Sequence, residues 1–145
     1  MGIKIYRDNL SLTTDPVTML KDNLFKTIQY AKNFNEEAKK FKIKQSKKPN
    51  SYKFVISKIN QLEQDRYYIL KDADAMRLQR KAMFASIAEK QVAGIDQALI
   101  KLKKVKAVFT QKAYINDPSI NALNPEAMIA GIRIKIEPTA AKLSN

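Results

Sequence analysis

The 145-residue chain contains neither cysteine nor histidine, and these two absences exclude most catalytic and metal chemistry. Without cysteine there is no disulfide, no thiolate nucleophile and no thiolate metal ligand. Without histidine the commonest general base and the commonest transition-metal ligand are missing. Carboxylates two positions apart, such as Asp72 and Asp74, point in different directions on a helix and cannot share a substrate. The sequence therefore predicts a protein that is not an enzyme, with no cofactor, metal or small-molecule substrate.

Glycine and proline are scarce too, at three and five residues. Three isolated glycines cannot build a phosphate-binding loop. Between Pro49 and Pro118 the sole helix breaker is Gly94, in a stretch rich in helix-forming residues. The sequence predicts a mainly α-helical fold, with residues 1–145 as a single domain and residues 15–114 as its helical core.

Apolar residues at helical spacing predict long helices packed on one another. The first helix should begin with Asp15 as its N-cap and a proline in its first turn, and should cover residues 16–44. The second should be capped by Asn50 or Ser51 and should begin a largely helical stretch over residues 52–112.

The apolar stripe of this second stretch changes phase near Gly94, so we expect an interruption there. Either a third helix begins near Gly94, which we favour, or one long helix bends at that point. An unbroken helix over residues 51–113 would be roughly 90 Å long, which exceeds a compact domain. The predicted architecture is an elongated helical bundle or hairpin of two to three long helices.

The two ends of the chain, residues 1–14 and 115–145, have a different pattern. Asn124 and Gly131 bracket an expected short helix. Isoleucines that alternate with other residues predict one short β-strand at each terminus. Because a lone pair of strands is marginal in water, the strands either pair against the helices or add to a neighbouring subunit. The candidate assembly residues are Ile3, Ile5, Ile132, Ile134 and Ile136.

The net charge of +13 comes from two windows that contain no acid. Eight lysines lie between Glu37 and Glu63, and five lie between Asp96 and Asp117. A charge so localised attracts nucleic acid, an anionic membrane or an acidic protein face, unless it is only a lysine-rich solvated surface. We expect the first window to be the main site. The candidate binding residues are Lys39, Lys40, Lys42, Lys44, Lys47, Lys48, Lys53, Lys101, Lys103, Lys104 and Lys106.

Aromatic residues accompany these windows, among them Phe41, Tyr52, Phe109 and Tyr114. Rings among lysines can stack on nucleic-acid bases while the amines follow the phosphates. The first three residues also belong to or adjoin the apolar stripes, which favours packing in the core. Both interpretations stay open at this point.

The chain starts with no signal-peptide pattern and has no apolar run long enough to span a bilayer, so we expect it in the cytoplasm or within a particle such as a virion. Long helices, strand-like tails and a basic surface favour a structural or assembly subunit of a virion, connector ring or ribonucleoprotein, with itself or other subunits as partners. The alternative is a free-standing, non-specific nucleic-acid-binding protein. A helical adaptor for an acidic protein is the third hypothesis.

Overall fold

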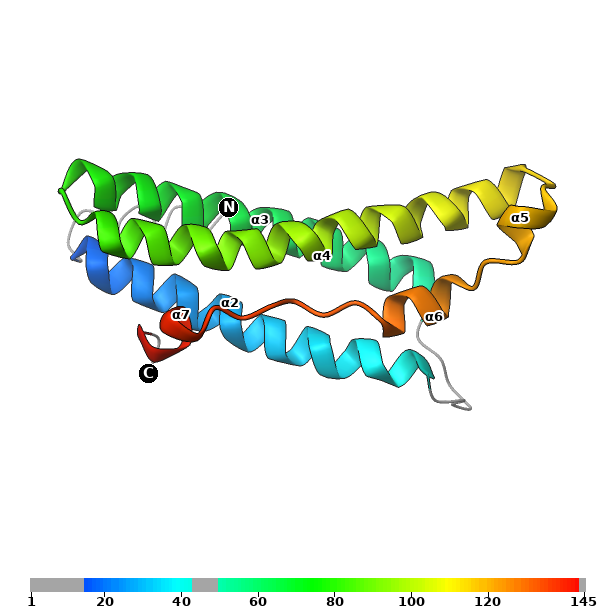
Figure 1. Ribbon diagram of the computed structural model, residues 1–145, viewed down its shortest axis with the longest axis horizontal. Helices are drawn as coiled ribbons and strands as arrows, with labels where there is room; N and C mark the ends of the chain where they lie inside the picture. Colours follow the sequence, from blue (N-terminus) through cyan, green and yellow to red (C-terminus); the bar gives the residue numbers. More distant parts are fainter. Residues whose placement is uncertain (1–14, 43–49, 144–145) are drawn as a thin grey trace.

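The computed structural model describes residues 15–42 and 50–143, which are mainly helical (Figure 1). The predicted mainly α-helical fold is confirmed. The expected N-terminal strand, with Ile3 and Ile5, lies outside the described residues. The helices, in chain order, are α2 (Pro16–Lys39) with the 3-10 turn η1 (Lys40–Lys42), α3 (Ser51–Leu78), α4 (Ala82–Tyr114), α5 (Pro118–Asn121), α6 (Pro125–Ala130) and α7 (Pro138–Leu143).

The first two long helices begin where the capping signals predicted. The Asp15 carboxylate accepts a hydrogen bond from the backbone N–H of Thr18 at 3.4 Å, and Pro16 follows it in the first turn. The Asn50 side chain accepts from the backbone N–H of Lys53 at 3.0 Å. Each side chain satisfies an N–H that the first helical turn leaves without a partner, so both helix starts depend on local sequence alone.

The interruption between α3 and α4 lies at residues 79–81, so the prediction of a break near Gly94 is wrong. Arg80 has a φ of 59°, in the left-handed region, and the N–H of Lys81 bonds to the carbonyl of Met76 at 2.8 Å. Glycine usually takes the left-handed position after a helix, because other residues carry a Cβ that disfavours it. An arginine there gives no such signal in the sequence.

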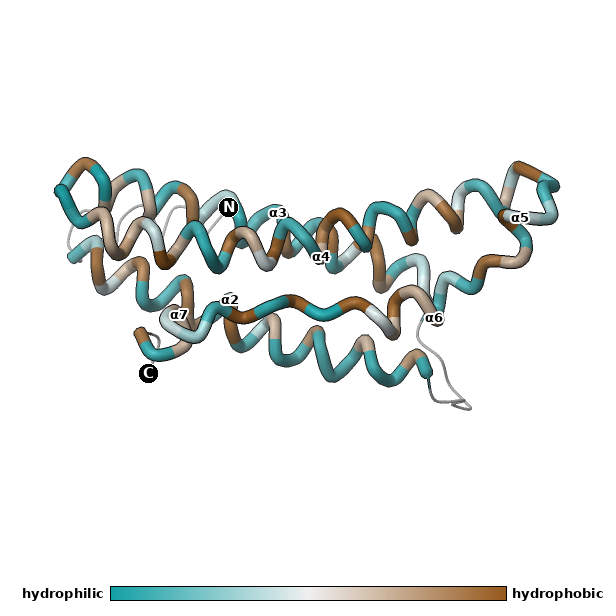
Figure 2. The backbone as a smooth tube through the Cα atoms, viewed as in Figure 1, coloured by the Kyte–Doolittle hydropathy of each residue, from teal (hydrophilic) through white to brown (hydrophobic). Residues whose placement is uncertain are grey.

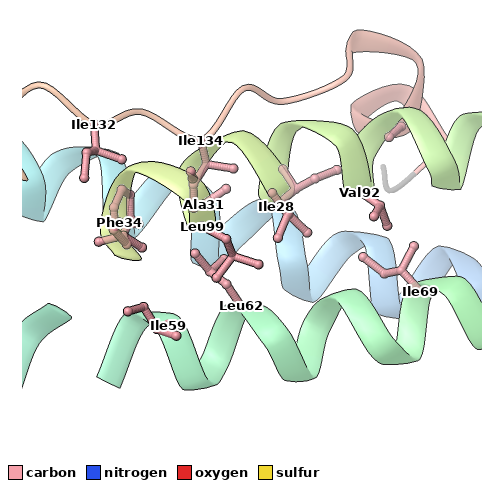
Figure 3. Close-up of a cluster of buried hydrophobic side chains, with 14 of the residues drawn as sticks. Ile28, Ala31, Phe34, Ile59, Leu62, Ile69, Val92, Leu99, Ile132 and Ile134 are labelled. Atoms are coloured by element: carbon pink, nitrogen blue, oxygen red, sulfur yellow. The ribbon is translucent and has the colours of Figure 1, made fainter. Parts of the chain in front are cut away.

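The helices α3 and α4 form an antiparallel hairpin, and α2 runs along it (Figure 1). Their apolar stripes meet in one core, in which Phe34, Leu62 and Ile69 are completely buried (Figure 3). Met83, an apolar residue in the first turn of α4, is not part of this core and is 71% exposed. The core therefore lies along the length of three long helices.

Residues 132–137, here called the C-terminal strap, take the place of the predicted C-terminal β-strand. They are extended and alternate hydrophobic with hydrophilic residues, but no strand pairs with them in the part of the chain that is described (Figure 2). The Asn35 side chain instead accepts from the N–H of Ile134 at 2.8 Å and donates to its carbonyl at 3.1 Å. The N–H of Glu137 donates to Gln91 at 2.8 Å. Side chains of α2 and α4 thus replace a neighbouring strand.

Gly94 lies in α4 where the strap crosses it. An added Cβ at this position would lie 2.2 Å from the carbonyl oxygen of Lys135, far closer than real Cβ contacts allow. Glycine here permits the close approach of two backbones, and it does not break the helix. The sequence singled out Gly94 as a helix interruption. The structure shows that this glycine instead makes room for the backbone of the strap.

Candidate nucleic-acid interface

The two lysine windows come together at one end of the helical bundle. The end of α2 with η1, the start of α3 and the second half of α4 all lie there (Figure 1). The rings of Phe41 and Phe54 are 4.9 Å apart between centroids, and those of Tyr52 and Phe109 are 5.8 Å apart. The hairpin explains this convergence, since α3 leads away from the first window and α4 brings the second one back. The described lysines of this surface, the basic end, are Lys39, Lys40, Lys42, Lys53, Lys101, Lys103, Lys104 and Lys106.

All eight of these lysines are exposed, and few of them are neutralised. Lys39 pairs with Glu36 at 3.7 Å and Lys103 pairs with Glu63 at 3.5 Å, and both pairs lie at the surface. Such pairs hold their partners only weakly in water. The lysines without an ion pair in the described parts of the chain are Lys40, Lys42, Lys53, Lys101, Lys104 and Lys106. Three further candidates, Lys44, Lys47 and Lys48, lie outside the described residues.

Lys58 belongs to the first window by sequence but not to this surface. Its side chain is only 13% exposed and pairs with Glu37 at 3.2 Å. The ammonium also lies 5.0 Å from the ring centroid of Tyr30 and 5.1 Å from that of Phe54. Lys58 therefore ties α3 to α2, and cation–π contact adds to the ion pair.

The phenol of Tyr30 shares this buried polar cluster. Burial raises the pKa of Tyr30 above its usual range, and the nearby carboxylates of Asp65 and Glu37 raise it further. Both effects disfavour the phenolate, so Tyr30 stays neutral across the physiological range.

Lys112 also has a hydrogen-bond partner within the chain. It follows the candidate lysines on α4, and its ammonium donates to the carbonyl of Leu123 at 2.6 Å. This bond holds the segment between α5 and α6 against the end of α4. The structure thus separates lysines with internal partners from lysines that face outward, a division that charge counting could not make.

The aromatic residues near the windows divide in the same way. Phe41 is 8% exposed and lies in the core, as its stripe position predicted. Tyr52 is 42% exposed, so it does not lie in the core, although its stripe position favoured packing there. Its ring meets Phe109 edge-on, and Phe109 is partly buried. Tyr52 and Phe109 line a surface hollow of about 340 Å³ together with Thr110, Ala113 and Tyr114.

The isoleucines expected to act in assembly lie elsewhere. Ile132 and Ile134 are each 2% exposed and belong to this chain's own core (Figure 3). Ile136 is partly buried against that core. In this position they stabilise the strap against α2 and α4. Their role in assembly, like that of Ile3 and Ile5, stays a prediction.

A second groove, between α3 and α4, has a volume of about 450 Å³. Its charged residues already pair across the hairpin, with Arg66 bound to Asp96 at 2.6 Å and Lys103 to Glu63. In residues 15–42 and 50–143 no cluster of three or more potential ligands could hold a metal ion. None of the helices in those ranges is both long and apolar enough to cross a membrane. The basic end is therefore the strongest candidate site.

Comparison with known proteins identifies no relative. No protein-family model, no curated protein and no solved structure matches this chain.

Proposed function

We propose that the protein is a non-enzymatic structural subunit of a larger particle, and that its basic end holds the phosphate backbone of nucleic acid. One observation carries the proposal: two acid-free lysine windows, distant in sequence, meet at one end of the bundle, where most of the described lysines have no ion pair. Bringing like charges together is unfavourable unless an acidic partner compensates for them. Nucleic acid supplies such compensation at regular spacing.

The type of cation supports backbone contact without sequence preference. The chain has far more lysine than arginine, and the candidate residues are all lysines. Lysine is a compact point charge that suits phosphate, whereas arginine presents the planar fork that reads guanine edges. Each phosphate that a lysine neutralises releases bound counterions, so affinity should fall steeply as salt rises.

The shape of the molecule supports a role in a particle. Three long helices give an elongated body (Figure 1), and the described parts of the two lysine windows lie at one end of it. At the opposite end the α3–α4 turn exposes two large apolar side chains, Leu78 at 87% and Met83 at 71%. A body with its lysine windows at one end and two exposed apolar side chains at the other suits an ordered array in which every copy directs its lysines to the same nucleic acid.

The test compares matched lysine-to-glutamine triples in a salt titration. Fluorescence anisotropy would measure the affinity for two labelled duplexes of unrelated sequence. The basic-end variant carries Lys101→Gln, Lys104→Gln and Lys106→Gln, and the control carries Lys21→Gln, Lys26→Gln and Lys90→Gln, three exposed lysines away from that end. The basic-end triple should weaken both duplexes equally and lower the log–log salt slope by about 0.9 for each lost contact. The control should change neither value appreciably.

A third variant tests whether the first lysine window contributes more to the binding affinity than the second. It carries Lys44→Gln, Lys47→Gln and Lys48→Gln. We expect it to lose more affinity than the triple on α4. Equal losses in all three variants would mean that total charge matters and position does not, which contradicts a site at the basic end.

Light scattering with and without the duplex tests the structural role. A subunit should form a complex of fixed stoichiometry containing several copies of the chain. One chain per duplex under all conditions would contradict the role in a particle and favour a free-standing binding protein. No binding to nucleic acid, together with binding to an acidic protein, would favour the adaptor hypothesis.

A further inference from the structure

The hollow beside Tyr52 has features that packing of the bundle does not explain. Tyr114, the last residue of α4, is 85% exposed, and none of the ring contacts within the described residues involves it. Tyr52 is 42% exposed and touches Phe109 only edge-on, at an interplanar angle of 83°. Aromatic ring surface is therefore exposed to solvent at this place.

The hollow is also large enough for a small ligand. Its volume of about 340 Å³ falls at the lower end of the roughly 300–1,000 Å³ typical of small-ligand sites. Ala113 contributes only a methyl group to its lining, and Thr110 adds a hydroxyl whose hydrogen bond goes to the carbonyl of Lys106 at 3.2 Å. A flat, mostly apolar group such as a nucleobase fits this combination of rings and small side chains.

The charges around the hollow match a phosphate chain. Lys53 follows Tyr52 directly, and Lys106 lies one helical turn before Thr110. Two carboxylates are close as well, Asp117 three residues after Tyr114 and Glu126 bonded to Ser51 beside Tyr52; their hydrogen bonds fix their positions but leave their negative charge. Asp117 accepts from the N–H of Ser119 at 2.9 Å, and Glu126 accepts from the hydroxyl of Ser51 at 3.2 Å. The Ser119 bonds hold the pKa of Asp117 below its usual range, so its charge stays fixed in that cap.

We propose that this hollow stacks a base of single-stranded nucleic acid while the neighbouring lysines hold its phosphates, an inference that rests on the function proposed above. Bases within a duplex are already stacked on one another, so only a single strand can present a free base face. Stacking on aromatic side chains accepts every base, which agrees with binding that shows no sequence preference.

The test separates base contacts from phosphate contacts by the choice of probe. One probe is a labelled oligodeoxythymidylate of about 16 nucleotides, the upper end of common single-strand site sizes. The other is an abasic oligonucleotide of the same length, with the same phosphates and no bases. If one base stacks, the wild type should bind the thymidylate roughly 5- to 150-fold more tightly than the abasic strand.

Two variants at exposed positions should remove this preference without unfolding the chain. Tyr114→Ala removes one ring, and Ala113→Leu fills the hollow. Both should bring the two affinities close together and leave the salt slope unchanged, because the lysines remain. The matched control is Tyr67→Ala, which removes a ring that is 59% exposed on α3 and takes no part in the hollow. This control should keep the full preference.

A third variant adds a spectroscopic readout. Tyr114→Trp keeps an aromatic face and introduces the only tryptophan of the chain. Its fluorescence should be quenched by the thymidylate and not by the abasic strand.

Equal affinity of the wild type for the two strands, or a preference that survives both Tyr114→Ala and Ala113→Leu, would overturn the stacking site. In that case the triple variant Lys101→Gln, Lys104→Gln and Lys106→Gln still decides the proposed function. If it weakens both strands, the phosphate-binding surface stands without the stacking site. If it weakens neither, both proposals fail.

Discussion

Replacing Gly94 with alanine should destabilise the protein, although the same change within most helices is stabilising. Gly94 lies in the interior of α4, where alanine is normally favoured over glycine by roughly 0.5–1 kcal/mol. Here the new Cβ would meet the carbonyl oxygen of Lys135 at 2.2 Å and its carbonyl carbon at 3.2 Å. Both are backbone atoms, so no side-chain rotation can relieve the contact. The strap or the helix must move.

The strap is poorly placed to move. Asn35 holds it at Ile134 and Gln91 holds it at Glu137, on either side of the contact. Forcing an extra carbon into a packed site costs about 1–3 kcal/mol. After the gain in helix propensity is subtracted, we expect a net loss of up to about 2.5 kcal/mol. Complete release of the strap would expose Ile132 and Ile134 and would cost more, about 3–6 kcal/mol.

Urea unfolding followed by circular dichroism measures this difference. Ala107→Gly, at an exposed site on the same helix, measures the effect of helix propensity alone and should lower the free energy of unfolding by about 1 kcal/mol. Hydrogen exchange supplies a local readout, since the amide of Ile134 should exchange faster in Gly94→Ala while amides in the middle of α3 keep their protection. An unfolding midpoint at or above that of the wild type, with an unchanged m-value, would refute the reasoning.

Two further predictions concern single side chains. Asn35→Ala should lower the free energy of unfolding by about 1–3 kcal/mol, because the N–H and carbonyl of Ile134 lose the partners that Asn35 provides. Chemical denaturation measures this difference, and an unchanged unfolding midpoint would show that water replaces the amide without loss of stability. Tyr30→Phe should reduce the loss of stability above about pH 9, which chemical denaturation measures. There the phenol of the unfolded chain begins to lose its proton while the raised pKa keeps the folded phenol protonated, so rising pH favours unfolding of the wild type until the folded phenol also titrates. Equal losses of stability at alkaline pH in both proteins would contradict this reasoning.

Much of the helical framework could be predicted because its causes are local. The caps at Asp15, Asn50 and Asn124 each bond to an N–H three residues further along the chain. Apolar spacing likewise placed most of the core side chains, since a helix repeats its faces every three to four residues. Predictions failed where a residue departs from its usual conformation, as Arg80 does in the turn between α3 and α4.

The candidate site was predictable only in part. The sequence shows that the lysines lie in two acid-free windows, but not that these windows share one end of the molecule. Nor could it separate Lys53, which is exposed, from Lys58, which is paired with Glu37 between two rings. The difference depends on which face of α3 meets α2, and hence on packing.

The sequence by itself determined the helical character of the chain, the caps at Asp15, Asn50 and Asn124 and the amount of charge, because each depends on composition or on residues within a few positions of one another. Only the tertiary structure decided where the strap lies, why residue 94 is glycine and which lysines face outward. Asn35 and Ile134 are 99 positions apart, and their pairing exists only after the helices have packed and α2 has come to lie beside the strap. Contacts at that separation depend on the whole arrangement of helices, which no local pattern of residues records.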